Sequence, residues 1–225
     1  MKKQALLLVG SAHQPRSTSQ SLGEYLLERL AKGGLDTETL FLHRALRSEE
    51  TTEELLAAVD RADPVILAFP LYVDTLPYLV TRTLELLAAH RQDRDLPGGQ
   101  RLLVIVNCGF PEAAHNAVAL EICRRFARET GFTWAGGLAL GGGGAINGRP
   151  LSQVQGLARN VIRALDMTAE ALLRGEAAPP AAVALMERPM IPAWLYIRIG
   201  HRLWKRQARK YGTSGRLMAR PFVPS

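Results

Sequence analysis

The sequence has few of the residues that build metal sites or disulfides. It contains two cysteines, Cys108 and Cys123, in 225 residues, and its five histidines show neither HExxH nor Cys/His spacing. We therefore expect no metal ion and no disulfide framework. Long apolar runs are also missing, since none approaches the ~20 residues that cross a bilayer. The apolar run at residues 5–9 is too short for a secretory signal. The prediction is a cytoplasmic protein with reduced thiols.

The glycine motifs of several nucleotide-binding and hydrolytic proteins are absent as well. The sequence has no GxxxxGK[ST] loop, which argues against a nucleoside triphosphate, and no GxGxxG fingerprint, which argues against a standard dinucleotide-binding domain. It also has no GxSxG turn, so the loop serines lack a nucleophile elbow. Any ligand site must therefore be built in another way.

Positive charge is distributed unevenly along the chain. The net charge is +7, from 28 Lys and Arg residues against 21 Asp and Glu. Residues 181–225 hold nine of the basic residues and one acid, Glu187, so residues 1–180 hold 19 basic and 20 acidic residues and are almost neutral. Electrostatic attraction to a partner therefore belongs to the tail. Nothing in the tail indicates sequence-specific binding of nucleic acid, and we expect none.

Expected strands and helices alternate along the first 175 residues. Short apolar runs that stop at Gly, Pro or Asn are typical of strands buried on both faces, and an amphipathic stretch follows each of them. The expected strands are residues 5–9, 35–42, 64–69, 101–106 and 132–140; the expected helices are residues 19–32, 49–62, 78–90, 113–130 and 151–174.

Five such units predict a doubly wound α/β domain. Short strand-helix connections favour an open five-stranded parallel sheet with helices on both faces, in the order 2-1-3-4-5. In this arrangement a ligand binds beyond the carboxyl ends of the strands. We place the domain at residues 1–175 and an appendage at residues 176–225, which begins with an Ala/Pro-rich linker.

The loop after the first expected strand has the composition of an anion site. It leads directly into a helix, whose first N–H groups and dipole favour a phosphate. Hydroxyl groups and positive charge come from Ser11, His13, Arg16, Ser17, Thr18 and Ser19. An ordinary capped Ser/Thr turn explains the same residues. Taken alone, this loop leaves both interpretations open.

The loops after the third, fourth and fifth expected strands meet at the same edge of the sheet. Prolines stiffen the first of them, which offers a mainly apolar wall: Pro70, Leu71, Tyr72, Val73 and Asp74. The next contains Asn107, Cys108, Gly109, Phe110 and Glu112, and the last begins with Gly141 and Gly142 of the four-glycine run at 141–144. Glycines let a backbone approach a ligand closely. The alternative is that Leu71 and Tyr72 only pack over the sheet.

Neither cysteine shows the surroundings of a reactive thiol. No base or cation stands beside Cys108 with certainty, so we expect it to line the ligand rather than act as a nucleophile. Cys123 falls at a core position of an expected helix and is predicted to be inert.

Taken together, the loops resemble the NADPH-dependent FMN reductase and multimeric-flavodoxin group of the flavodoxin-like superfamily. The resemblance is carried by Gly10-Ser11 with residues 16–19, by residues 70–74 with Pro77, and by residues 107–112, and it covers residues 4–170. It implies that residues 11–19 hold the FMN phosphate, that residues 70–74 and 107–112 line the isoalloxazine, and that the glycines after the fifth strand close the site. The chain lacks the cysteine cluster of iron-sulfur members, so FMN alone is implied.

The same resemblance implies an activity. The expected function is transfer of a hydride from NAD(P)H through FMN to a small acceptor such as a quinone, a flavin or an azo compound, in a cytoplasmic dimer or tetramer. Backbone N–H groups at residues 107–109 are candidates to stabilise the reduced flavin, and no side chain is assigned as catalytic. Two alternatives stay open: a flavodoxin-type electron carrier, and a flavin-free interaction module. The sequence leaves the acceptor and the choice of nicotinamide open.

Residues 192–212 form an expected basic amphipathic helix. One stripe holds Trp194, Ile197, His201, Trp204, Ala208 and Tyr211, while Lys and Arg gather on the other side. Three partners stay open for this helix: the protein's own body or a second subunit, an anionic membrane surface, and an acidic macromolecule.

Overall fold

The computed structural model describes residues 4–12, 16–92 and 99–219. The chain divides into two compact units, Met1–Met190 and Ile191–Ser225. His13, which we predict in the first loop, lies outside the described residues.

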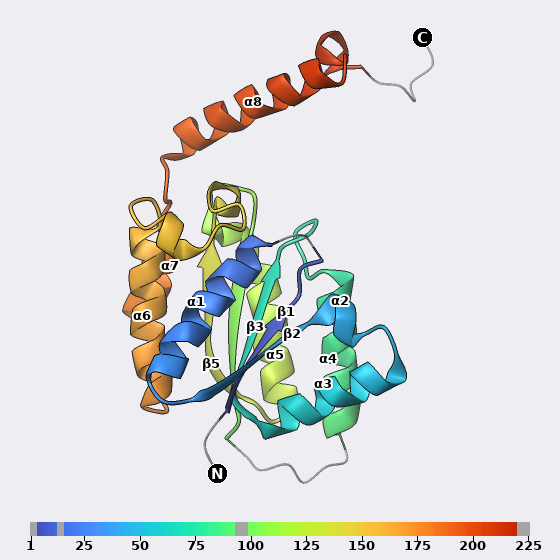
Figure 1. The fold of residues 1–225 in the computed structure, drawn as a ribbon, viewed down its shortest axis with the longest axis vertical. Helices are drawn as coiled ribbons and strands as arrows, with labels where there is room; N and C mark the ends of the chain where they lie inside the picture. The colour runs from blue at the N-terminus through green and yellow to red at the C-terminus, as the bar shows by residue number, and fades with distance from the viewer. Residues whose placement is uncertain (1–3, 13–15, 93–98, 220–225) are drawn as a thin grey trace. The chain divides into compact units, whose positions relative to one another are not determined.

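The first unit is built on a parallel sheet of five strands (Figure 1). Its spatial order is β2-β1-β3-β4-β5, and every neighbouring pair is parallel. The strands are β1 (Gln4–Val9), β2 (Asp36–Phe41), β3 (Ala62–Pro70), β4 (Arg101–Asn107) and β5 (Thr133–Leu140). The predicted fold class and strand order are therefore confirmed. The order places the carboxyl ends of β1, β3 and β4 next to one another.

The apolar runs form strands because both faces of the sheet are covered. Successive side chains of a strand point to opposite faces. In β1, Leu7 and Val9 join the core on one face, whereas Leu6 and Leu8 join the core on the other. All four are at most 1% exposed. Continuous apolar sequence is what such a doubly covered strand requires.

Helices cover the two faces as separate layers (Figure 1). On one face α1 (Thr18–Lys32), α6 (Arg159–Leu173) and α7 (Pro180–Met186) contribute to a single core. The other face is covered by α2 (Leu42–Ala45), α3 (Glu49–Arg61), α4 (Tyr78–Arg91) and α5 (Ala117–Glu129). Short 3-10 turns stand at η1 (Ala113–Asn116), η2 (Gly143–Ala145) and η3 (Leu151–Gln153).

Two expectations about the helices are wrong in part. The helix expected at 151–174 begins only at Arg159: residues 151–158 form turns that bury Leu151 and Val154, and Gly156 in this stretch disfavours a helix. Residues 175–192, which we expect to form the Ala/Pro-rich linker, contain α7. Pro180 suits a first helical position, and Ala182 and Met186 are fully buried in the core. The compact body thus extends past residue 175, to Met190.

The second unit consists of α8 (Ala193–Lys210) and the turn η4 (Ser214–Arg216). The expected helix at 192–212 is therefore present. Among the helices in the described ranges, none is long and apolar enough to cross a membrane.

Candidate functional site

A small hollow opens where β1, β3 and β4 end. Its volume is about 200 Å³. Residues from four loops line it: Ser11, Arg16, Ser17, Thr18, Ser19, Pro70, Tyr72, Asn107, Gly144, Asn147 and Gly148. None of these residues is acidic, and Arg16 is basic. The hollow therefore favours an anion.

The start of α1 supplies backbone donors to this hollow. Ser17 is the N-cap, and its Oγ accepts a hydrogen bond from the Gln20 amide at 3.1 Å. The first intrahelical bond runs from the Ser21 amide to the Ser17 carbonyl at 3.0 Å. The Thr18 and Ser19 amides therefore precede the helical ladder, and the positive end of the helix dipole lies beside them. Such a helix start binds phosphate groups.

Arg16 adds charge to the same wall. Its guanidinium forms an ion pair with Glu24, and Gln20 Nε2 holds the other Glu24 oxygen at 2.7 Å. Within the described ranges, the buried Arg16 Nε has no hydrogen-bond partner. A buried donor without an acceptor is costly, and a phosphate oxygen in the hollow would supply the acceptor. This orphaned donor and the helix start together fit the phosphate of FMN.

The loop after β5 is fastened to the start of α1. Thr18 Oγ1 donates to the Gly143 carbonyl at 3.0 Å, and the Gly148 amide donates to Thr18 Oγ1 at 3.4 Å. Gly148 has φ +69°, and a Cβ there would lie 2.1 Å from the Arg16 carbonyl oxygen. Only glycine allows this approach of two backbones. The last loop thus forms one side of the hollow.

Asn107 ties together three of the loops. Its Nδ2 donates to Ser19 Oγ at 2.7 Å and to the Phe69 carbonyl at 3.2 Å. The side chain is buried, and its Oδ1 lies close to Gly143. Asn107 therefore fixes the start of α1 against the end of β3. The ligand contacts expected of Asn107 and Ser19 stay a prediction; the structure shows that each holds the other in place.

Residues 72–75 form a tight, strained turn at the rim. Tyr72 and Thr75 exchange both backbone hydrogen bonds at 3.1 Å. Between them Val73 and Asp74 have φ +48° and +60°, values that a β-branched residue rarely adopts. Val73 is 96% exposed at the tip of the turn. Strained backbone of this kind gathers at ligand sites, and an exposed apolar tip suits a flat ring.

The loop at 108–112 packs against the glycines at 141–143. The Cys108 amide donates to the Leu140 carbonyl, the Gly142 amide to the Phe110 carbonyl, and the Gly143 amide to the Cys108 carbonyl. A Cβ on Gly141 would lie 2.2 Å from the Pro111 carbonyl oxygen. Gly141 is therefore small because two loops meet there, and Gly142 has φ +66°, which favours glycine; neither residue lines the hollow. Because the Cys108 amide is already bonded, it is not a free donor for a reduced flavin.

The buried Cys108 thiol points into its own loop. Its Sγ lies 3.5 Å from the Phe110 carbonyl oxygen, 3.6 Å from the Glu112 carbonyl oxygen and 3.5 Å from Asn116 Nδ2. Burial is the largest effect on this group and raises the pKa of the thiol. For Cys123, burial raises the pKa to about 12. Thiolate, the nucleophilic form, is therefore scarce at both positions.

We expect both thiols to resist alkylation in the folded protein. At pH 8 they should react at least ~100-fold more slowly with a thiol reagent than in urea, because burial disfavours the thiolate and limits access. The Cys123→Ala variant isolates Cys108 for the same measurement. Fast modification of Cys108 in the native protein, located by mass spectrometry, would contradict its placement.

The structure brings together eight of the predicted residues around the hollow: Ser11, Arg16, Ser17, Thr18, Ser19, Pro70, Tyr72 and Asn107. It leaves Leu71, Val73, Asp74, Cys108, Gly109, Phe110 and Glu112 outside the lining. Phe110 is about half exposed and stacks on His115 with ring centroids 4.4 Å apart. Their contact with a flavin ring stays a prediction.

Of the remaining lining residues, Gly144 belongs to the glycine run predicted to close the site, whereas no prediction includes Asn147 and Gly148. The last two form an Asn-Gly pair, which is a strong turn signal in sequence. Asn147 has φ +50° and Gly148 φ +69°. This pair was the available sign that the fifth loop turns back toward α1.

Comparison with known proteins supports the fold alone. No protein-family profile matches the sequence, and no curated protein matches it. Among solved structures, RosB with bound 8-demethyl-8-formylriboflavin-5'-phosphate superposes with a TM-score of 0.57 at 16% identity, over 76% of this chain and 79% of that one. A Streptococcus pneumoniae flavodoxin gives 0.53 at 18% identity, over 76% and 98%. The NADH:FMN oxidoreductase EMOB, in its apo form, gives 0.53 at 17% identity, over 85% and 97%. The chain therefore has the flavodoxin-like fold.

Proposed function

We propose that the protein binds FMN with its phosphate at the start of α1 and works as an NAD(P)H-dependent oxidoreductase. The observation that carries the proposal is the hollow itself. Among the residues that the structure describes, it combines a helix N-terminus, a lining without an acidic residue, and a buried Arg16 Nε that has no hydrogen-bond partner. Solved structures of the same fold add support, because they include a flavodoxin and an NADH:FMN oxidoreductase.

Different residues of this chain bind the phosphate of FMN, position the loops and cover the ring. The amides of Thr18 and Ser19 and the guanidinium of Arg16 bind and neutralise the phosphate. Asn107 and Gly148 keep the loops at the spacing that this binding needs. The turn at 72–75 and Phe110 offer apolar surface that excludes water from one side of a ring. Bound FMN supplies the hydride chemistry, and a small acceptor such as a quinone or flavin takes the electrons.

The alternative is an electron carrier of the flavodoxin type, which has no turnover with NAD(P)H of its own. We place it second because carriers of that kind are strongly acidic, whereas residues 1–180 hold 19 basic and 20 acidic residues.

We also propose a homo-oligomer, a dimer or tetramer, for the active protein.

The visible spectrum of the purified protein tests the proposal. After incubation with FMN and removal of free flavin, we expect one bound flavin per chain. Anaerobic NADH or NADPH should bleach its visible bands, and a quinone should restore them. Flavin that stays oxidised with both nicotinamides but accepts electrons from dithionite would establish the carrier instead. Failure to retain FMN would remove both functions.

A further inference from the structure

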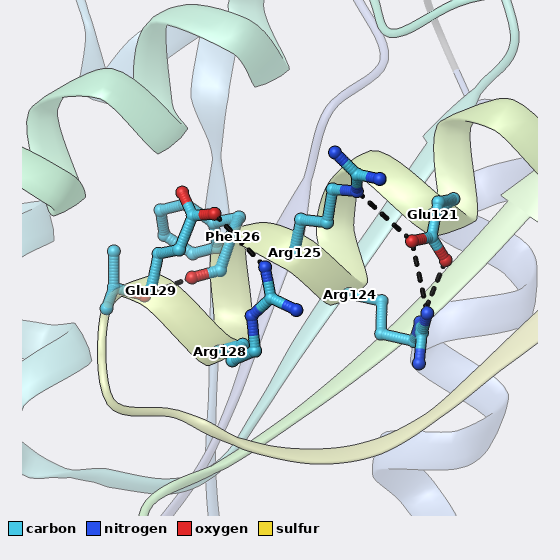
Figure 2. A network of polar contacts seen from close by, with 7 residues as sticks. Glu121, Arg124, Arg125, Phe126, Arg128 and Glu129 are labelled. Atoms are coloured by element: carbon cyan, nitrogen blue, oxygen red, sulfur yellow. Dashed lines mark hydrogen bonds and ion pairs between the residues drawn. The ribbon is translucent and has the colours of Figure 1, made fainter.

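The basic residues of the second unit have no acidic residues beside them in the sequence, unlike the arginines on the surface of the first unit. Residues 191–225 contain no Asp or Glu, and α8 contains six basic residues. In the body, exposed arginines of α5 are paired instead: Arg124 and Arg125 with Glu121, and Arg128 with Glu129 (Figure 2). The positive charge of α8 therefore stands without acidic neighbours of its own unit.

The basic residues of α8 lie on one side of the helix. At 3.6 residues per turn they fall within an arc of about 140°; they are Arg198, Arg202, Lys205, Arg206, Arg209 and Lys210. The opposite side carries a long apolar surface, formed by Trp194, Tyr196, Ile197, Leu203, Trp204 and Tyr211. Trp194 and Trp204 are 67% and 72% exposed, so the described residues leave most of both side chains uncovered.

Two properties of this surface match a lipid bilayer. Trp and Tyr have amphipathic rings that settle at the boundary between headgroups and acyl chains, and a row of Lys and Arg beside them attracts anionic headgroups. An 18-residue helix is ~27 Å long, and helices of about this length that carry a basic and an apolar side are the kind that lie flat in that boundary. Charge complementarity favours an anionic surface, because every charged side chain of the unit is basic or His.

We propose that α8 is a peripheral membrane helix that binds anionic phospholipid with its Trp and Tyr side chains inserted among the headgroups. This inference is independent of the proposed flavin chemistry, because it rests on residues 191–219 alone. Anionic phospholipid is then the partner of the excess positive charge in residues 191–225.

Sedimentation of the full-length protein with vesicles tests the proposal. At physiological ionic strength the protein should sediment with vesicles of equal parts phosphatidylglycerol and phosphatidylcholine, and much less with phosphatidylcholine alone. High salt should weaken the binding, because it screens exposed charges. In a Trp134→Phe variant, which retains only Trp194 and Trp204, the fluorescence should shift to the blue on addition of the anionic vesicles.

A matched pair of variants separates α8 from charge in general. Arg202→Gln/Arg206→Gln should weaken vesicle binding about 30-fold, the loss expected for two charges near an anionic surface. Arg125→Gln/Arg128→Gln removes the same charge from α5 and should leave the binding within about twofold. Equal effects of the two double variants would overturn the proposal.

Two further results would also overturn it. One is failure of the full-length protein to bind anionic vesicles. The other is evidence that α8 forms a subunit contact instead. In that case Trp194 and Trp204 would already emit in the blue without lipid, the Trp194→Ala/Trp204→Ala variant would dissociate an oligomer, and the protein would not bind vesicles. Intact circular dichroism of each variant shows that the fold is retained.

Discussion

Replacing Gly148 by alanine is expected to reduce the affinity for FMN by about 100-fold. The new Cβ would lie 2.1 Å from the Arg16 carbonyl oxygen, and φ is +69°. Backbone strain of this kind costs ~1–3 kcal/mol, and ~1.4 kcal/mol corresponds to a factor of ten. Because the obstacle is backbone rather than a flexible side chain, residues 16–18 must move. They are the residues that we propose to hold the phosphate. Titration of the apo-protein with FMN, followed by flavin fluorescence, measures the loss.

Gly34→Ala is the matched control for this experiment. Gly34 also has a positive φ, of +94°, but a Cβ there meets no atom within 4 Å. Both variants should therefore lose ~1 kcal/mol of stability from the unfavourable backbone conformation. Only Gly148→Ala should lose FMN affinity. Equal affinity in the two variants would show that the loop after β5 takes no part in binding.

Replacing Asn107 by alanine is expected to lower the free energy of unfolding by ~2–3 kcal/mol and to weaken FMN binding. The substitution removes two donated hydrogen bonds and leaves Ser19 Oγ and the Phe69 carbonyl as buried acceptors. Unmade hydrogen bonds of buried groups cost ~1–3 kcal/mol each. Urea denaturation of the apo-protein measures the first effect, and FMN titration measures the second.

Asn116→Ala separates the two effects of Asn107. Asn116 is fully buried and donates to the Ala113 and Leu140 carbonyls at 3.0 and 3.3 Å, but it does not line the hollow. Its loss should cost a similar stability of ~2 kcal/mol and leave FMN affinity unchanged. If Asn107→Ala bound FMN as tightly as the unmodified protein, Asn107 would be a purely structural residue.

Most of the fold was predictable because its signals are local. The apolar runs at residues 5–9 and 101–106 and the Gly-Gly stop after residue 32 are visible in sequence, and the order 2-1-3-4-5 follows from five short strand-helix connections. The later start of α6 and the presence of α7 were not predictable in this way. Leu151, Val154, Ala182 and Met186 are buried by contacts with distant elements, and such contacts override local preference.

The sequence predicted which loops form the candidate site, but it did not predict which groups of each residue are available to a ligand. Ser17, Thr18 and Ser19 were grouped by composition as phosphate donors. In the structure the Ser17 side chain caps the helix, that of Thr18 donates to Gly143, and that of Ser19 accepts from Asn107. The Thr18 hydroxyl hydrogen is therefore engaged within the protein, whereas the hydroxyls of Ser17 and Ser19 accept in these contacts and can still donate to an anion, as the backbone amides can. Sequence composition cannot show this division.

By itself the sequence determined the sheet order and the separation of positive charge into residues 181–225, and it predicted the edge of the sheet for a ligand site. Each of these depends on periodicity, turn residues or charge count along the chain. The tertiary structure alone decided which residues line the hollow. That set depends on contacts such as those of Asn107 with Ser19 and of Gly148 with Arg16, whose partners stand 88 and 132 positions away along the chain. Only the packed sheet brings their loops to hydrogen-bond distance.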